Sequence, residues 1–156
     1  MDYKFVPMSK LCANEIAYNW KYSGVYSFYD MTADEDDLID FLEEKNWDRH
    51  YFAVLNNKGE LIGYYSFYFE DEAMWVGFGL KPELTGIRLG ATFVMAGINF
   101  VVEKFNYKMN YIMLSVALFN KRAIRTYEKI GFQLVNTYVQ HTNGGEYEFI
   151  EMKKDI

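Results

Sequence analysis

The sequence is poor in the residues that define several classes of protein. It has one cysteine, Cys12, and two prolines in 156 residues. A single cysteine excludes a disulfide framework and a cysteine-ligated zinc site. Neither histidine, His50 or His141, has a partner at metal-ligand spacing, so we expect no metal. No apolar run approaches the ~18–20 residues that span a bilayer, and residues 1–10 lack the apolar core of a signal peptide. We therefore expect a soluble, cytoplasmic protein that does not bind a membrane.

Basic residues are also scarce, and they are unevenly distributed. The chain has 16 basic and 22 acidic residues, for a net charge of −6. Residues 1–80 carry six basic and 15 acidic groups, whereas residues 81–156 carry ten basic and seven acidic groups. An acidic chain of this kind is not expected to bind nucleic acid. The uneven charge is either ordinary solvated surface or a sign of two faces, one for an anionic and one for a cationic substrate.

The chain has enough apolar residues for one sizeable core, and we predict a single domain over residues 1–156. Hydrophobic residues make up 51% of the sequence and aromatic residues 19%. Their spacing predicts the order β-α-α-β-β-β-α-β-α-β-β, a mixed α/β fold with helices packed on a largely antiparallel sheet. The predicted strands are 3–7, 51–56, 60–69, 73–80, 111–117, 132–140 and 146–153. The predicted helices run from Ser9 to about 22, from a capping box of Thr32 and Glu35 to about 45, from 90 to 105, and from 120 to 130.

A strand that runs into a glycine-bearing loop and then into a long helix is the most informative stretch. The strand ends at Leu80, and the helix begins at Gly90. The unpaired N–H groups at such a helix start bind phosphate groups. Gly86 and Gly90 let the backbone approach a ligand closely, and Arg88 adds a positive charge. The same pattern also occurs as an ordinary connection between a strand and a helix.

A second stretch follows the strand at 111–117. Asn120 is placed to cap the next helix, and Tyr127 lies two turns further along the same helix face. Gly131 ends that helix. Taken singly, these residues are a helix cap, a core tyrosine and a helix terminator.

Together, the two stretches resemble the GNAT superfamily of acyl-coenzyme A-dependent N-acyltransferases. The shared motifs are Gly79-Leu80-Lys81-Pro82, the Thr85–Gly90 loop and Asn120-x-x-Ala123-x-x-x-Tyr127-x-x-x-Gly131-Phe132. The resemblance implies that acetyl-coenzyme A is the co-substrate and that a primary amine attacks its thioester directly in a ternary complex. Tyr127 would protonate the departing thiolate. The residues that the resemblance assigns to the coenzyme are Phe78, Gly79, Leu80, Thr85, Gly86, Ile87, Arg88, Leu89, Gly90, Ala91, Asn120, Ala123 and Tyr127.

The Thr85–Gly90 loop, which the resemblance assigns to the phosphates and which we call the phosphate loop, departs from the family pattern at two positions. The usual form is Gln/Arg-x-x-Gly-x-Gly/Ala, but here Thr85 stands at the first position and Arg88 replaces the middle glycine. We expect Arg88 to have a negative φ and to point outward, which would preserve the site and add a cation. A positive φ at this position would strain the loop or weaken the site.

The general base and the acceptor pocket are less well specified. Glu72 is the best candidate for the base, because it is expected to begin the strand that lines the cleft; the alternative is that it only belongs to a solvated turn. The family uses the segment around residues 22–30 for acceptors. The candidate acceptor-binding residues are therefore Tyr26, Phe28, Tyr29 and Asp30, unless they only pack beneath a loop.

The altered loop and the missing obvious base leave a second function open. The chain would then be a non-catalytic module that binds or senses acyl-coenzyme A. Exposed strand edges and aromatic residues would suit a homodimer.

Overall fold

A seven-stranded sheet organises the computed structural model, which describes residues 2–47 and 51–156; His50 lies outside these residues. The strand order is β1-β2-β3-β4-β5-β7-β6. All neighbouring strands are antiparallel except β4 and β5, which are parallel. The mixed α/β fold and the largely antiparallel sheet are thus confirmed. The strands are β1 (Lys4–Pro7), β2 (Tyr51–Leu55), β3 (Leu61–Glu70), β4 (Ala73–Leu80), β5 (Tyr111–Ala117), β6 (Gln133–Thr142) and β7 (Gly145–Asp155).

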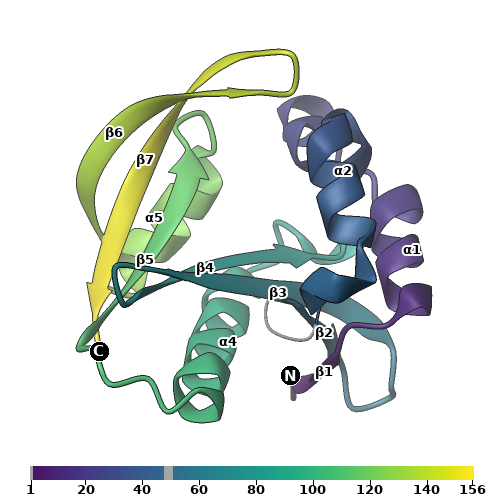
Figure 1. The fold of residues 1–156 in the computed structure, drawn as a ribbon, viewed down its shortest axis with the longest axis horizontal. Helices are drawn as coiled ribbons and strands as arrows, with labels where there is room; N and C mark the ends of the chain where they lie inside the picture. Colours follow the sequence, from purple (N-terminus) through teal and green to yellow (C-terminus); the bar gives the residue numbers. More distant parts are fainter. Residues whose placement is uncertain (1, 48–50) are drawn as a thin grey trace.

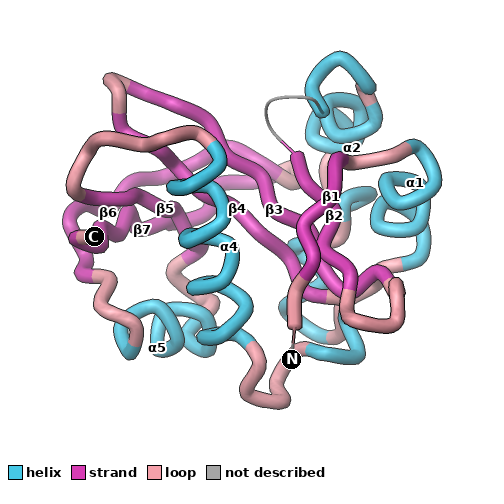
Figure 2. The backbone as a smooth tube through the Cα atoms, turned by 90° about the horizontal axis from the view of Figure 1, so that it is seen from below, coloured by secondary structure: helices cyan, strands magenta, loops and turns pink. Residues whose placement is uncertain are grey.

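Helices cover both faces of the sheet, and their order along the chain is as predicted (Figure 1). Helices α4 and α5 lie on one face, and α1 and α2 pack together on the other face over the N-terminal strands (Figure 2). The α-helices are α1 (Lys10–Asn19), α2 (Glu35–Leu42), α4 (Gly90–Lys104) and α5 (Lys121–Lys129). Short 3₁₀ helices are η1 (Gly24–Tyr29), η2 (Met31–Ala33), η3 (Glu44–Asn46) and η4 (Pro82–Leu84).

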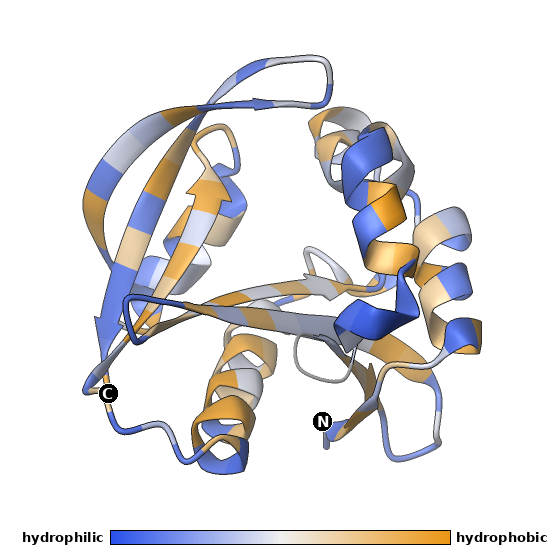
Figure 3. Cartoon of the chain, in the orientation of Figure 1, coloured by the Kyte–Doolittle hydropathy of each residue, from blue (hydrophilic) through white to orange (hydrophobic). Residues whose placement is uncertain are grey.

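The core lies mainly between the sheet and α4. This helix is apolar over most of its surface (Figure 3), and its buried residues include Phe93, Val94, Ile98 and Val101. Tyr65 of β3 packs against Gly97, where a Cβ would lie 1.6 Å from the tyrosine ring. The absence of a side chain at residue 97 therefore lets helix and sheet approach closely.

The predicted start of α2 is wrong. The N-cap is Asp34, whose Oδ1 accepts a 2.9 Å hydrogen bond from the Asp37 N–H. Thr32 lies in η2 instead, where its hydroxyl accepts a hydrogen bond from Lys21 Nζ. Both residues are good caps by type, and the 3₁₀ turn before the helix decides between them. Among the described residues, no helix is long and apolar enough to cross a membrane.

Candidate functional site

Strands β4 and β5 pair only at their beginning and then separate. The one pair joins Trp75 to Met113. Beyond it, a cavity of about 410 Å³ opens between the two strands, within the usual range for ligand sites. Residues 76–80 of β4 and 114–116 of β5 line it. The edge of β4 that faces β5 is therefore available to a ligand along this length.

The start of α4 closes one end of this cavity. Helices α1, α2 and α5 each begin with a capping side chain, from Ser9, Asp34 and Asn120 respectively. Helix α4 follows Leu89, and no described side chain caps it. Its first-turn N–H groups thus remain available, and together with the helix dipole they favour an anion.

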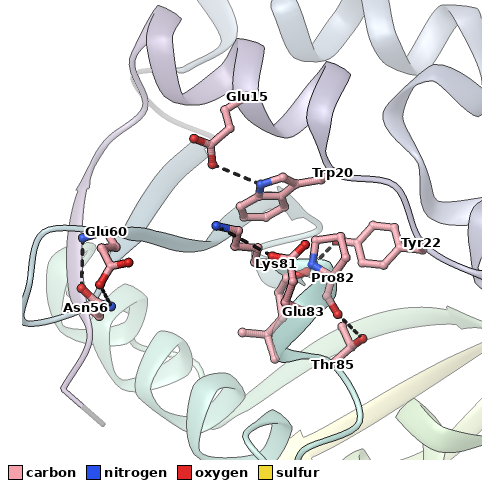
Figure 4. Close-up of polar contacts among 10 residues, drawn as sticks. Glu15, Trp20, Tyr22, Asn56, Glu60, Lys81, Pro82, Glu83 and Thr85 are labelled. Atoms are coloured by element: carbon pink, nitrogen blue, oxygen red, sulfur yellow. Dashed lines mark hydrogen bonds and ion pairs between the residues drawn. The ribbon is translucent and has the colours of Figure 1, made fainter.

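Arg88 has φ +68°, so the expectation of a negative φ is wrong. The position requires the left-handed conformation that glycine adopts most easily, which gives a physical reason for the glycine in the family pattern. An arginine held there carries backbone strain on the order of 1 kcal/mol. Arg88 nevertheless lines the cavity, as do Gly86, with φ +75°, and Thr85. The Thr85 hydroxyl donates to the Pro82 carbonyl at 2.7 Å (Figure 4).

Arg122 is a second cation at this end of the cavity, and it is not among the residues predicted from the sequence. It lies in the first turn of α5, with its guanidinium 4.2 Å from the centre of the Tyr26 ring. A Cβ on Gly86 would lie 3.3 Å from Arg122 Nη1, so the glycine of the loop leaves room for this side chain. In the sequence, the only feature that could have indicated Arg122 is its position as a basic residue in the turn after Asn120. Arg88 and Arg122 are the only charged residues among the described residues that line the cavity.

Tyr127 lies on α5 at the inner part of the cavity. Its ring contacts Phe78 edge-on, with the ring centres 5.6 Å apart, and also contacts Phe132. Burial, together with the nearby Tyr29, raises the pKa of the Tyr127 hydroxyl, so it stays protonated near neutral pH. This hydroxyl forms no hydrogen bond with a described residue. Among the described residues, every fully buried side-chain oxygen has a hydrogen-bond partner, so the Tyr127 hydroxyl is not fully buried. The Tyr127 hydroxyl is therefore open to the cavity.

Asn120 has two structural roles at this site. Its Oδ1 accepts from the Ala123 N–H at 3.2 Å, and its Nδ2 donates to the Tyr29 hydroxyl at 3.2 Å. Burial raises the pKa of Tyr29. Asn120 thus links the start of α5 to η1 across the cavity.

The predicted coenzyme residues divide into two groups. Ile87, Leu89 and Ala91 do not line the cavity, and the Ile87 side chain is exposed. The predicted residues that the structure does bring together around the cavity are Phe78, Gly79, Leu80, Thr85, Gly86, Arg88, Gly90, Asn120, Ala123 and Tyr127.

The predicted acceptor residues also divide. Tyr26 and Tyr29 line the cavity, whereas Phe28 and Asp30 do not. Phe28 packs in an aromatic cluster with Phe119, at 5.2 Å between ring centres. The Asp30 carboxylate accepts a 2.9 Å hydrogen bond from the Tyr22 N–H and so holds the chain in place.

Glu72 does not begin the strand that lines the cleft, so that part of the prediction is wrong. It is the second residue of the two-residue turn between β3 and β4, and both Asp71 and Glu72 have positive φ, at 51° and 69°. The side chain of Glu72 is exposed and does not line the cavity. Val76, the nearest residue of β4 that lines the cavity, is four positions further along the chain, or roughly 13 Å along an extended strand. The role of general base therefore does not fit Glu72.

Comparison with known proteins gives one family. The model of the acetyltransferase (GNAT) family matches residues 16–132. No curated protein sequence matches the chain.

Solved structures resemble the whole chain in fold. A chimera of the Vibrio cholerae spermidine N-acetyltransferase SpeG with hSSAT has a TM-score of 0.78 at 18% identity, over 99% of this chain and 96% of that one. A GNAT-family acetyltransferase from Bacillus anthracis has a TM-score of 0.74 at 14% identity, over 99% and 95%. The ribosomal-protein-S5-alanine acetyltransferase of Vibrio fischeri has a TM-score of 0.65 at 20% identity, over 99% and 93%.

Proposed function

The chain belongs to the acetyltransferase (GNAT) family, and we propose that it transfers an acetyl group from acetyl-coenzyme A to a primary amine in a ternary complex. One observation carries the proposal. The cavity between β4 and β5 has an uncapped helix start with two arginines at one end and the protonated hydroxyl of Tyr127 further inside. We also propose that residues 1–156 form one domain for this activity.

The charge of the cavity lining and the separated edge of β4 support binding of the coenzyme. The first-turn N–H groups of α4, with Arg88 and Arg122, would bind the pyrophosphate. The separated edge of β4 at Gly77–Leu80 would hold the extended arm through its backbone, and Phe78 supplies apolar contact. These contacts would place the thioester near Tyr127.

Catalysis would then rest on positioning and on one proton donor. The amine nitrogen attacks the thioester carbonyl carbon, and the carbon–sulfur bond breaks as the acetyl group moves to nitrogen. Tyr127 donates its proton to the departing sulfur, the nitrogen releases one proton to water, and Tyr127 regains a proton from water. Holding the amine and the thioester together removes much of the entropic barrier, and backbone N–H groups of β4 polarise the carbonyl.

The alternative is a non-catalytic module that binds or senses acyl-coenzyme A. Two observations favour it: the positive φ of Arg88, and the absence of an acidic or histidine side chain from the described lining of the cavity. The first observation concerns the strength of coenzyme binding, and the second concerns the general base. Neither removes Tyr127 as the proton donor.

Calorimetric titration with acetyl-coenzyme A, followed by a screen of amines for thiol release, tests the proposal. Micromolar binding with amine-dependent thiol release is the expected result. Binding without thiol release for any amine would support the sensing module. The absence of binding would overturn both functions.

A further inference from the structure

The face of the sheet opposite α4 carries a second group of aromatic and acidic residues. Side chains alternate along a strand, so the residues next to the buried core residues of β3, β4, β5 and β7 point to this face. In Figure 1, α4 lies below β3 and β4, and the β6–β7 hairpin rises on the other side. The residues on this face include Tyr68 of β3, Trp75 of β4, Ser115 of β5, Tyr138 of β6 and Glu151 of β7.

This face is continuous with the cavity. Gly77 and Ser115 both line the cavity. Gly77 is two residues beyond Trp75 on the same side of β4, and Ser115 is the direct partner of Glu151 across β5 and β7. A molecule whose end lies in the cavity therefore has Trp75 and Glu151 as its next neighbours on this face.

Aromatic rings form two walls of this surface. Tyr68 and Trp75 are a cross-strand pair with nearly parallel rings, 6.0 Å apart and 8° between planes. On the other side, the Tyr138 ring stacks on Phe149 at 5.7 Å, and its hydroxyl hydrogen-bonds to Ser115. Tyr68 is half-exposed, so ring surface is available to a ligand. The faces of aromatic rings attract cations.

Glu151 places a carboxylate on this surface. Asn136 Nδ2 donates a 2.8 Å hydrogen bond to Glu151 Oε1, which fixes the carboxylate. Burial raises the pKa of Tyr68, and the nearby Glu70, Tyr138 and Glu151 raise it further. Tyr68 on one wall is therefore close enough to Tyr138 and Glu151 on the other wall to interact with them electrostatically. Lys153 is on the same side of β7, but its ammonium lies over the Tyr111 ring, 4.6 Å from the centre.

The contrast with the cavity indicates which part of an acceptor belongs here. A reacting nitrogen must be neutral, and a carboxylate beside it would stabilise its ammonium form. The described lining of the cavity has arginines as its only charged residues and suits the neutral form. Glu151 therefore suits a different nitrogen of the same molecule, one that stays charged.

We propose that this face, formed by Tyr68, Trp75 and Glu151, binds a second, cationic group of the acceptor. The substrate class is then a small diamine or polyamine: one nitrogen reacts in the cavity while another is held by the Glu151 carboxylate and the aromatic rings. This inference rests on the proposed acetyl transfer, because it assigns an acceptor to that reaction.

Binding and turnover test the inference separately. Diamines of three to five carbons, and the monoamines of matched length, are titrated into the protein saturated with coenzyme A. The diamines are expected to bind at least tenfold more tightly than the monoamines. Glu151→Gln, which retains an oxygen to accept from Asn136, is expected to remove most of that difference while leaving coenzyme A affinity within twofold. In turnover, the same variant is expected to raise KM for the diamine more than it lowers kcat.

Glu148→Gln is the matched control. Glu148 lies on the same strand, is exposed, and points to the opposite face from Glu151. It is expected to leave diamine binding unchanged. A Trp75→Leu variant removes aromatic surface without changing charge and is expected to weaken diamine binding severalfold.

Two results would count against different conclusions. Equal binding of diamines and monoamines, or an unchanged difference in Glu151→Gln, would overturn the cation site. Normal diamine binding without acetyl transfer to any amine would instead overturn the proposed function and leave the cation site standing.

Discussion

The hydroxyl of Tyr22 donates a 2.6 Å hydrogen bond to the carbonyl oxygen of Leu80, the last residue of β4. The two residues are 58 positions apart in the chain. Figure 4 shows Tyr22 beside the segment from Lys81 to Thr85, which leads into the phosphate loop. Since Tyr26 and Tyr29 of η1 line the cavity, this bond connects the segment that carries them to the strand that forms one side of the cavity.

Replacing Tyr22 with phenylalanine is expected to loosen that connection. The loss of one partly buried hydrogen bond costs about 1 kcal/mol of unfolding free energy. Acetyl-coenzyme A affinity is expected to fall severalfold, because Tyr26 and Tyr29 are then held less firmly. Urea unfolding and calorimetry measure the two effects. Tyr18→Phe, at an exposed tyrosine of α1, is the control and should change neither.

Tyr127→Phe is expected to separate catalysis from binding. The ring and its contacts with Phe78 remain, but the proton donor is lost, so kcat should fall by about 10²-fold. The dissociation constant for acetyl-coenzyme A should stay within twofold. Steady-state kinetics and calorimetry provide the two numbers, and an unchanged kcat would remove Tyr127 from the proposed mechanism.

Substitutions of Arg88 are expected to separate strain from charge. At φ +68°, glycine fits and alanine does not, so Arg88→Gly should be about 1 kcal/mol more stable than Arg88→Ala. Both variants lose the same cation, and both should bind acetyl-coenzyme A about tenfold more weakly, as for one charge-assisted hydrogen bond of ~1.5 kcal/mol. Thermal unfolding and calorimetry test the pair. Tighter binding in Arg88→Gly would mean that Arg88 obstructs the site.

Glu72→Gln is expected to leave kcat and both KM values within twofold. The side chain is exposed at the β3–β4 turn and lies outside the cavity lining, so it cannot reach the amine. Glu72→Gly should in addition stabilise the turn slightly, because φ is +69° there. A tenfold loss of kcat in Glu72→Gln would restore it as a candidate base.

Stability is expected to fall steeply above pH 10. Burial raises the pKa of Tyr22, Tyr64, Tyr65 and Tyr127, and raises that of Tyr51 to about 12. Each of these tyrosines stays protonated in the folded state after it ionises in the unfolded state near pH 10, so the unfolded state binds fewer protons. The stabilisation is complete below pH 10 and is lost as pH rises towards the folded pKa, at about 1.4 kcal/mol per pH unit for each tyrosine.

Urea unfolding between pH 8 and 11 measures this slope. Tyr127→Phe should make it shallower by about 1.4 kcal/mol per pH unit. Tyr18→Phe, at an exposed side chain, should leave it unchanged. An equal change in both variants would mean that the burial of Tyr127 does not set the slope.

Local patterns in the sequence predicted much of the fold. The strand at 111–117 has the observed bounds, α4 differs from its prediction by one residue at its end, and α5 differs by one residue at each end. Asn120 caps α5 as expected, through the Ala123 N–H. These features depend on contacts within three or four residues, which a single sequence reports directly. The start of α2 was wrong because Thr32 and Asp34 are both good caps, and the preceding 3₁₀ turn decided between them.

The sequence by itself determined the order of the elements, the loop before α4, and the placing of Tyr127 two helical turns after Asn120. Only the tertiary structure decided that β4 and β5 separate after Trp75 and Met113, that Arg88 takes a positive φ, and that Glu72 lies outside the cavity. It also decided that Tyr68 and Glu151, which are 83 positions apart by their numbers, share one face of the sheet. The physical reason is that strand separation, loop conformation and face sharing depend on pairing between distant segments, which no local spacing encodes.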